Sequence, residues 1–592
     1  MTRIDFAVIL TAAAFLMPTA AISQPPDDAV LRSMQDELER SRKLAIPGLE
    51  KPYFIQYSLD DARTFSTSAS LGASLGVTDH QFRIPRVRVR VGDPSFDNTN
   101  YIFSDLTGGS RFDPEQFPVD DNYAVLRHDW WLATDRAYKG AVEAIARKRA
   151  ALKNITQPEV IPDLWAAKPM QKLLSPDTKE PDWSGWPERI RSLSGTFSSY
   201  PEIISSGVRF NDTRSTYYLV NSEGTTLRRP EPLAHLQVQA SAFTPDGMTV
   251  HDALSVPRIE LSSMPRPEEL RKRVEEVAKN VQALAKAPAG EAYSGPVLFD
   301  GIAGPQVFAE LLAPNLALGR RPVGEPGRQV PFLASELEGR LESRILPEFI
   351  DIVDDPAKKE WKGAPLLGSY EIDEEGTPAN PLTMVEKGRL KSFLLTRQPV
   401  KGFEASNGRA RLPGPFGAWS ASISNLFIHS SESVKGDELR KRFLRMLQDR
   451  NKPWGIIVRK MDFPSGASNE EARRLIQAAQ QSGVVRPVSA PLLIFKVFPD
   501  GREELVRGLR FRGFGLRSLR DIVAVSEETF TLDYLNNGLP FALLSGGGYV
   551  APVSVIAPSL LFDELELEHP RNDTPTLPIV PAPPLTSRNA SR

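Results

Sequence analysis

The stretch GPVLFDGIAGPQVFAELLAPNLALGR, residues 295–320, decides how the second half of the chain is interpreted. Its first part, Pro296–Phe299, predicts a buried strand, and a glycine-rich turn follows. A helix is expected from Gly304 and Pro305 onward, because proline is tolerated in the first helical turn, where its missing N–H would have no partner. In an apolar run this helix carries one carboxylate, Glu310. Since strand, turn and helix start together often hold chemistry, Glu310 is the first candidate site residue.

Length and charge limit the function classes. A chain of 592 residues is long enough for two to four domains with substantial cores. Lys and Arg number 72 against 74 Asp and Glu, so no long-range field favours nucleic acid or an anionic membrane surface. The chain contains no cysteine, so it has no disulfide and no thiolate ligand. No nucleic-acid partner is expected.

The first residues have the order of a signal peptide. MTR precedes the apolar run FAVILTAAAFLM and the small residues PTAAISQ, which predicts a signal peptide at 1–23 with cleavage after Ser23. The apolar run is shorter than the roughly 20 residues of a membrane span, and no later segment predicts a span. Because Asp5 is unusual in a signal peptide, a short uncleaved anchor is the alternative. With no cysteine for lipid attachment, we expect a periplasmic or secreted protein.

Residues 27–290 predict a mixed α/β N-terminal domain. Helical spacing favours helices near 25–44, 125–152 and 265–286, and two strands are expected, joined by the turn Asn221–Gly224. The segment Arg86–Gly92 alternates valine with arginine, so its valines predict one strand face and its arginines the other. We expect the arginines to form a solvated face; a substrate-facing basic strip is the alternative.

Two acidic segments and six histidines are the candidates for metal or acid–base chemistry. Carboxylates can hold a hard cation or share acid and base work, but the spacing fits no twelve-residue calcium loop, and acidic residues beside Gly and Pro are typical of exposed loops. A zinc site commonly draws two ligands from one short segment, and no two histidines lie that close. The acidic residues are Asp351, Asp354, Asp355, Glu371, Asp373, Glu374 and Glu375; the histidines are His80, His128, His235, His251, His429 and His569.

Six segments occur in an order that resembles the C-terminal domain of the TldD/PmbA family of metallopeptidases. In that family a helix with H-E-x-x-x-H is followed by D-D-E-G-x-P, a hairpin, N-G-R and a T-N-x-F-like strand. NSEG and the strands before it resemble the family's N-terminal domain. The segments here are AELLAP (309–314), IVDD (352–355), GSYEIDEEGTP (368–378), EKGRLKSFLLTR (386–397), ASNGRAR (405–411) and SISNLFI (422–428).

The resemblance also shows what is missing. The zinc-bearing branch holds its metal with the two histidines of H-E-x-x-x-H and a later cysteine. Laid on that motif, this chain has Ala309 and Pro314 at the histidine positions, retains Glu310 at the general-base position, and has no cysteine anywhere. Neither Ala nor Pro has a side-chain donor atom, so no bound metal is expected. Pro314 should also kink or end the helix.

Three functional hypotheses follow from the resemblance and from the composition of the C-terminal end. The first is an exported, non-catalytic subunit that binds an extended peptide, as a homodimer or a heterodimer with a zinc-bearing TldD-like paralogue. The second is an active metallopeptidase with a site rebuilt from His429 and the Asp373–Glu375 segment, or a metal-free mechanism. The third is a periplasmic envelope-interaction protein that docks through its proline-rich end, residues 571–592.

The predicted fold class is α+β, with the two-domain TldD/PmbA-like architecture that the resemblance implies. The mixed α/β N-terminal domain is expected at 27–290, with a boundary at the small-residue linker near residue 290. A β-rich C-terminal domain is expected at 291–570, and a disordered Pro-rich tail at 571–592. Glu310 is the candidate catalytic residue.

Overall fold

The computed structural model describes residues 28–102, 117–153, 161–176, 179–324, 332–414, 418–466, 477, 486, 488–538, 543–544 and 549–569. The predicted signal peptide at 1–23 and the predicted tail at 571–592 lie outside the described residues. Within the described residues, no helix combines the length and apolar composition that crossing a membrane would require.

The first of two large sheets is built from long antiparallel strands. Its order is β3-β2-β1-β6-β7, and both β5 and β8 pair with β7. The segment predicted as two strands around Asn221–Gly224 forms the hairpin β6–β7, in which the Gly224 N–H donates to Asn221 O. The strands are β1 (Pro52–Ser70), β2 (Ala73–Asp93), β3 (Phe96–Asp97), β5 (Gln171–Leu173), β6 (Ile203–Asn221), β7 (Thr226–Phe243) and β8 (Thr249–Arg258).

Four helices cover this sheet. Amphipathic spacing explains α4 (Pro267–Lys286), whose buried residues Leu270, Val274, Val277, Val281 and Leu284 recur every three or four positions, as predicted. This helix and α3 (Trp186–Gly195) share one core with the sheet. α1 (Ala29–Ser41) and α2 (Tyr123–Leu152) share another core with β1 and β2.

The second sheet is mixed and has eleven strands. Its order is β15-β14-β11-β18-β24-β9-β19-β20-β21, with β22 and β23 also paired to β24. β24 is buried almost without interruption from Ala551 to Phe562, because protein packs on both of its faces. The strands are β9 (Tyr293–Phe299), β11 (Ile350–Asp354), β14 (Leu382–Glu386), β15 (Arg389–Leu390), β18 (Asn425–Ser430), β19 (Gly455–Met461), β20 (Pro491–Val497), β21 (Glu503–Val506), β22 (Arg510–Arg512), β23 (Ile522–Asn536) and β24 (Ala551–Glu568).

Helices lie on both faces of the second sheet. α5 (Ala303–Val307) and α6 (Ala313–Leu316) pack into the larger core, and α7 (Gly436–Asp449) packs into a smaller one. Three two-stranded pairs complete the described strands: β4 (Tyr101–Ile102) with β10 (Val323–Gly324), β12 (Glu360–Trp361) with β13 (Ala364–Pro365), and β16 (Ala410–Pro413) with β17 (Trp419–Ala421).

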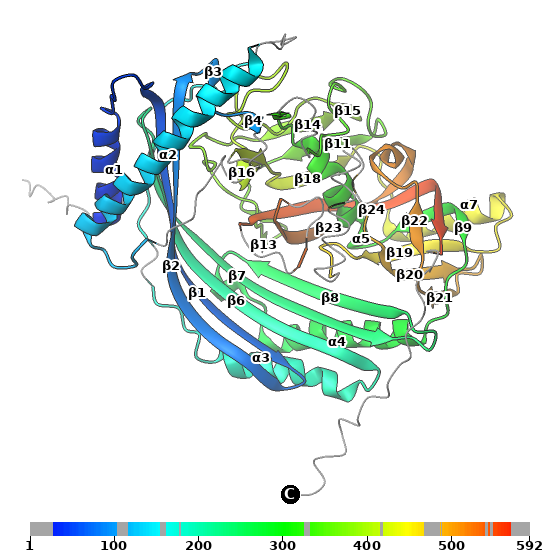
Figure 1. The fold of residues 1–592 in the computed structure, drawn as a ribbon. Helices are drawn as coiled ribbons and strands as arrows, with labels where there is room; N and C mark the ends of the chain where they lie inside the picture. Colours follow the sequence, from blue (N-terminus) through cyan, green and yellow to red (C-terminus); the bar gives the residue numbers. More distant parts are fainter. Residues whose placement is uncertain are drawn as a thin grey trace, which may run out of the picture.

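The long first sheet bends around the second (Figure 1). α3 and α4 lie on its outer side, while the eleven-stranded sheet lies within the curve. The chain passes between the sheets through residues 287–292, where the Arg507 guanidinium donates to Ala287 O at 2.9 Å and to Asp246 at 2.9 Å. The predicted α+β fold class is confirmed: helices flank one sheet, and a β-rich second part follows.

Candidate functional site

The strand, turn and helix predicted at 295–320 are present, and the helix starts tightly against β24. An added Cβ on Gly304 would lie 2.1 Å from the Pro558 carbonyl oxygen, so the helix and strand backbones touch here. The Gln306 side chain donates to Met461 O and Phe463 O and accepts from the Met461 N–H. These contacts fix the helix against β24 and the end of β19.

Pro314 changes the helix as expected. Between α5 and α6 the backbone forms a wider π-helical turn, Phe308–Leu312, closed by a hydrogen bond from the Ala313 N–H to Phe308 O. The wider turn accommodates a proline, which has no N–H for the carbonyl four residues before it. The helix ends two residues after Pro314, at Leu316.

Glu310 lies in the interior, in the π-helical turn. Its residue is 4% exposed, so it is not on the helix surface. Oε1 accepts a hydrogen bond of 2.6 Å from the Ser489 backbone N–H, while Oε2 has no partner among the described residues. Burial raises the pKa of Glu310 to about 8, and the nearby Asp462 carboxylate adds to that rise. Glu310 is therefore mainly protonated at neutral pH.

The residues around Glu310 do not fit a zinc ion. Ala309 is buried and offers a methyl group, and Pro314 offers a ring without a donor atom. In the part of the chain that the structure describes, no three His, Asp or Glu side chains gather closely enough to hold a metal ion. A zinc site normally needs three or four such ligands.

A second ionisable group near Glu310 joins the two sheets. Asp462, directly after β19, lies 3.1 Å from His251 Nε2 on β8 and accepts hydrogen bonds from Ser465 Oγ and the Gly466 N–H. Serine and histidine both contact the carboxylate, so the serine hydroxyl is not aimed at the imidazole as a nucleophile would be. The group holds the sheets together rather than forming a hydrolase triad.

The acidic segment Asp373–Glu375 is buried, which corrects the expectation of an exposed loop. Asp373 accepts the N–H groups of Glu375, Thr377 and Ala410, so its carboxylate organises the turn. Glu374, 3% exposed, pairs with Arg229 at 2.6 Å. Burial raises the pKa of both Asp373 and Glu374, while the Arg229 guanidinium lowers that of Glu374.

The other proposed metal ligands lie in different environments. His429 is exposed on β18, opposite Asp351 on β11, and the structure does not gather it with Asp373–Glu375 into a metal-binding group. Asp354 is fully buried and pairs with Arg409 Nε at 2.7 Å. Asp355 caps a turn by accepting the Ala357 N–H, and Glu371 pairs with Lys172.

The arginines of β2 do not form a solvated face, contrary to the expectation. Their side chains are 24%, 22% and 11% exposed at Arg86, Arg88 and Arg90. Arg86 stacks on Tyr549 and Arg88 on Trp419, both from the second half of the chain. The alternation predicted two faces correctly, but the curved sheet carries the second sheet on the arginine side.

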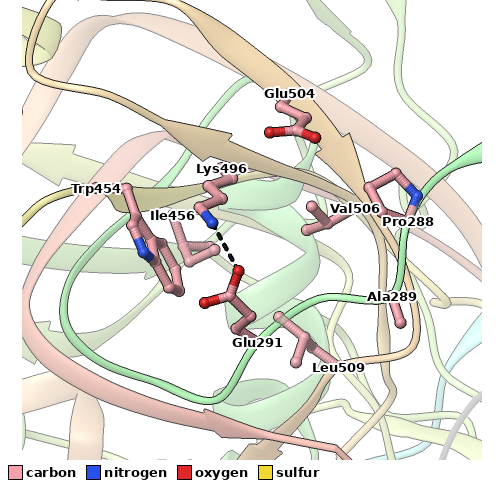
Figure 2. Close-up of a pocket in the computed structure, with 9 residues that line it drawn as sticks. All are labelled: Pro288, Ala289, Glu291, Trp454, Ile456, Lys496, Glu504, Val506 and Leu509. Atoms are coloured by element: carbon pink, nitrogen blue, oxygen red, sulfur yellow. Dashed lines mark hydrogen bonds and ion pairs between the residues drawn. The ribbon is translucent and has the colours of Figure 1, made fainter.

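A small pocket of about 80 Å³ lies elsewhere, beside the connection between the sheets (Figure 2). In it Lys496 pairs with Glu291 at 2.8 Å and lies over the Trp454 ring. The other lining residues include Ile456, Val506 and Leu509. Because its lysine and this glutamate already pair with each other, the pocket packs the connection and is not the candidate site.

Comparison with known proteins places part of the sequence in a family. Residues 291–450 match the PmbA/TldA metallopeptidase C-terminal domain. Two archaeal proteins named metalloprotease are similar. The one from Archaeoglobus fulgidus is 37% identical over 81 residues, 14% of this chain and 18% of its own length. The one from Methanothermobacter thermautotrophicus is 28% identical over 218 residues, 36% and 44% of the two lengths. The matched regions span less than half of either relative.

Solved structures extend the likeness in fold to most of the chain. TldE from Thermococcus kodakarensis has a TM-score of 0.53 at 13% identity, covering 90% of this chain and 100% of that protein. A Thermotoga maritima protein, which bears the name of a modulator of a DNA gyrase, has a TM-score of 0.54 at 15% identity and covers 90% and 99%. From its C-terminal domain sequence, its metalloprotease relatives and its fold, the chain belongs to the TldD/PmbA family.

Proposed function

We propose that this protein is a non-catalytic member of its family that binds an extended peptide as one subunit of a peptidase-type assembly. The state of Glu310 carries the proposal. At the family's general-base position stands a buried carboxyl group that already accepts a hydrogen bond from Ser489. Ala309 and Pro314 stand where the resemblance places the two histidines.

The chemistry of Glu310 supports loss of the hydrolytic step. A general base must be ionised and must touch the proton that it removes. Burial raises the pKa of Glu310 to about 8, so most of it is protonated at pH 7. One glutamate without further ligands also cannot hold a metal that would activate water.

The first sheet supports binding of an extended chain. β2 pairs with β1 along its length, but among the described strands its other edge pairs only with β3, at Gly92 and Asp93. An edge of this kind accepts an added strand through backbone hydrogen bonds, with little preference for sequence. The proposal is therefore peptide binding without cleavage.

Export and partnership are further parts of the proposal. The predicted cleavage after Ser23 favours a periplasmic or secreted protein. The partner would be a second copy of this chain or a zinc-bearing TldD-like paralogue. Such a paralogue would carry, in its own site, the zinc-binding histidines that Ala309 and Pro314 replace in this chain.

Metal content and peptidase activity measured on one sample test the proposal. The mature protein, purified without chelator and without a histidine tag, should contain no stoichiometric zinc by mass spectrometry and should not cleave unstructured peptides. Glu310→Gln should behave like the wild type in the same assay. Stoichiometric zinc with chelator-sensitive cleavage would instead establish an active peptidase with a rebuilt site.

A further inference from the structure

A charged and aromatic cluster joins β2 to the hairpin β16–β17 between the two sheets. Its six members are Arg86, Arg88, Glu374, Arg411, Trp419 and Tyr549, called here the intersheet cluster. Arg86 lies 4.8 Å from the Tyr549 ring centroid and Arg88 lies 5.1 Å from that of Trp419. The two rings meet edge to face at 5.8 Å, and Arg411 lies 3.9 Å from Glu374. Burial raises the pKa of the Tyr549 hydroxyl, and the nearby Glu374 charge adds to that rise, so Glu374 links the two parts of the cluster.

Two arginines of this region donate short hydrogen bonds to carboxylates. Arg86 donates to Asp60 at 2.7 Å. Arg229, beside the cluster, donates to Glu231 at 2.7 Å and to Glu374 Oε1 at 2.6 Å. These pairs are short, charge-assisted hydrogen bonds of the strong kind.

Two other arginines have no such bond. Arg88 reaches Glu375 only at 3.7 Å, and Arg411 reaches Glu374 only at 3.9 Å. Neither guanidinium makes a hydrogen bond to a side chain or backbone group within the described part of the chain. They lie instead over aromatic rings, Arg88 over Trp419 and Arg411 over Tyr370. Each guanidinium has five N–H donors, so this region holds many donors without acceptors.

Four buried polar atoms of the cluster also lack partners. They are Arg411 Nη1, Trp419 Nε1, the Tyr549 hydroxyl and Glu374 Oε2, and none has a hydrogen-bond partner among the described residues. Trp419 and Glu374 are only 4% and 3% exposed. Leaving a buried polar atom unpaired costs about 1–3 kcal/mol, so four together indicate that something else occupies their hydrogen bonds.

The donor set defines the occupant. Arg411, Trp419 and Arg88 offer N–H groups and Tyr549 offers a hydroxyl, whereas Glu374 Oε2 is the one open acceptor. Four guanidiniums (Arg86, Arg88, Arg229, Arg411) face four carboxylates (Asp60, Glu231, Glu374, Glu375). This balance favours a singly charged anion over a phosphate dianion. A planar carboxylate also matches the guanidinium fork.

We infer that the intersheet cluster binds the carboxylate of a peptide, with Arg88, Arg411 and Trp419 donating to its oxygens and Glu374 Oε2 accepting a neighbouring N–H. The inference deepens the proposed function, since it names the part of the peptide that the protein recognises. The carboxylate comes either from the C-terminus of the peptide or from an Asp or Glu side chain.

Calorimetry with capped peptides tests the inference on the full mature protein. The probes are N-acetyl-trialanine with a free C-terminal carboxyl, the same peptide as its C-terminal amide, and N-acetyl-Ala-Asp-Ala amide. We expect the free acid, the aspartyl peptide or both to bind at least about tenfold more tightly than the trialanine amide, the value of one charge-assisted hydrogen bond. Tighter binding of the free acid identifies a peptide C-terminus as the source of the carboxylate, and tighter binding of the aspartyl peptide identifies a side chain.

Variants locate the site. Arg411→Gln and Arg88→Gln should each abolish this acid-over-amide preference, and Arg411→Lys should restore part of it, because lysine keeps the charge but not the fork. Arg512→Gln, whose side chain is 67% exposed, is the matched control and should bind like the wild type. Thermal unfolding of each variant establishes that it is folded.

Two outcomes overturn the inference. Equal binding of acid and amide peptides by the folded wild type would mean that water, and not a peptide carboxylate, makes the open hydrogen bonds of the intersheet cluster. Binding of inorganic phosphate alone would mean an anion site unrelated to peptides. Both outcomes leave the proposed function standing if the protein remains free of zinc and inactive, while zinc-dependent cleavage would overturn the proposed function without changing the acid-over-amide comparison.

Discussion

Ser489, just before β20, donates its backbone N–H to Glu310 Oε1 at 2.6 Å and thereby fixes the one carboxylate of the helix that follows β9. The other oxygen, Oε2, faces no partner among the described residues. Burial raises the pKa of the Tyr534 hydroxyl, and the nearby Glu310 charge adds to that rise. The ionised form of Glu310 is therefore destabilised by its surroundings.

Glu310→Gln should make the protein more stable at high pH. The folded-state pKa of Glu310 is raised from 4.5 to about 8. Stability from the neutral carboxyl is therefore fully present below pH 4.5 and is lost as the pH rises through about 8, by about 1.4 kcal/mol per pKa unit. The melting temperature of the variant should exceed that of the wild type at pH 9 by more than at pH 5.

The control for this experiment is Glu276→Gln on the exposed face of α4. Its difference from the wild type should not change between pH 5 and pH 9. A Glu310→Gln curve parallel to the wild-type curve would show that Glu310 is ionised and solvated when folded.

Arg409→Met should be strongly destabilising. The Arg409 and Asp354 side chains are both 0% exposed and pair at 2.7 Å, and Arg409 also donates to Asn380 O and Asn407 O. Removing the guanidinium leaves a buried carboxylate without its partner, which costs about 3–5 kcal/mol. Urea unfolding measures the loss. Arg512→Met, at an exposed pair, should change the midpoint little.

Gly304→Ala should destabilise the helix that carries Glu310. An added Cβ would lie 2.1 Å from Pro558 O, and backbone must move to relieve that contact. The expected loss is about 1–3 kcal/mol, as for overpacking in a core. Gly140→Ala in the exposed part of α2 has open space and should stabilise by about 0.5–1 kcal/mol. Equal unfolding midpoints for the two variants would contradict this packing.

Expression of the full chain in a Gram-negative host tests the predicted export. Cleavage after Ser23 predicts a periplasmic protein whose intact mass and N-terminal sequence begin at Gln24. An intact chain that starts at Met1 in the membrane fraction would instead identify an uncleaved anchor.

Local sequence patterns were sufficient to predict most of the secondary structure. The three- and four-residue spacing of α4 and the Asn221–Gly224 turn act over a few residues, and both are where the sequence predicted them. The strand and helix around Glu310 were predicted correctly for the same reason. Alternation also separated the valines from the arginines of β2, since side chains on a strand alternate between its two faces.

Burial of charge could not be predicted in this way. Whether the side chain of Arg88 or Glu374 is exposed to solvent depends on which segments, distant in the sequence, pack against it. The acidic turn resembled an exposed loop because its partner Arg229 lies 145 residues earlier. Sequence reasoning missed Trp419 and Tyr549 as candidate residues. The signals for this region were the arginines of Arg86–Gly92, Glu374 in the acidic segment and Arg411 in the segment ASNGRAR.

The pairing of β24 with β9 sets the order in which the protein can be completed during synthesis. β9 pairs with β19 and with β24, and β24 ends at Glu568. The strands of the first sheet are all complete at residue 258, whereas the strand before Glu310 must wait almost 270 residues for the end of one of its neighbours, β24. A chain stopped before β24 would expose both β9 and β18 as open edges, so the second sheet cannot be complete until β24 has been synthesised.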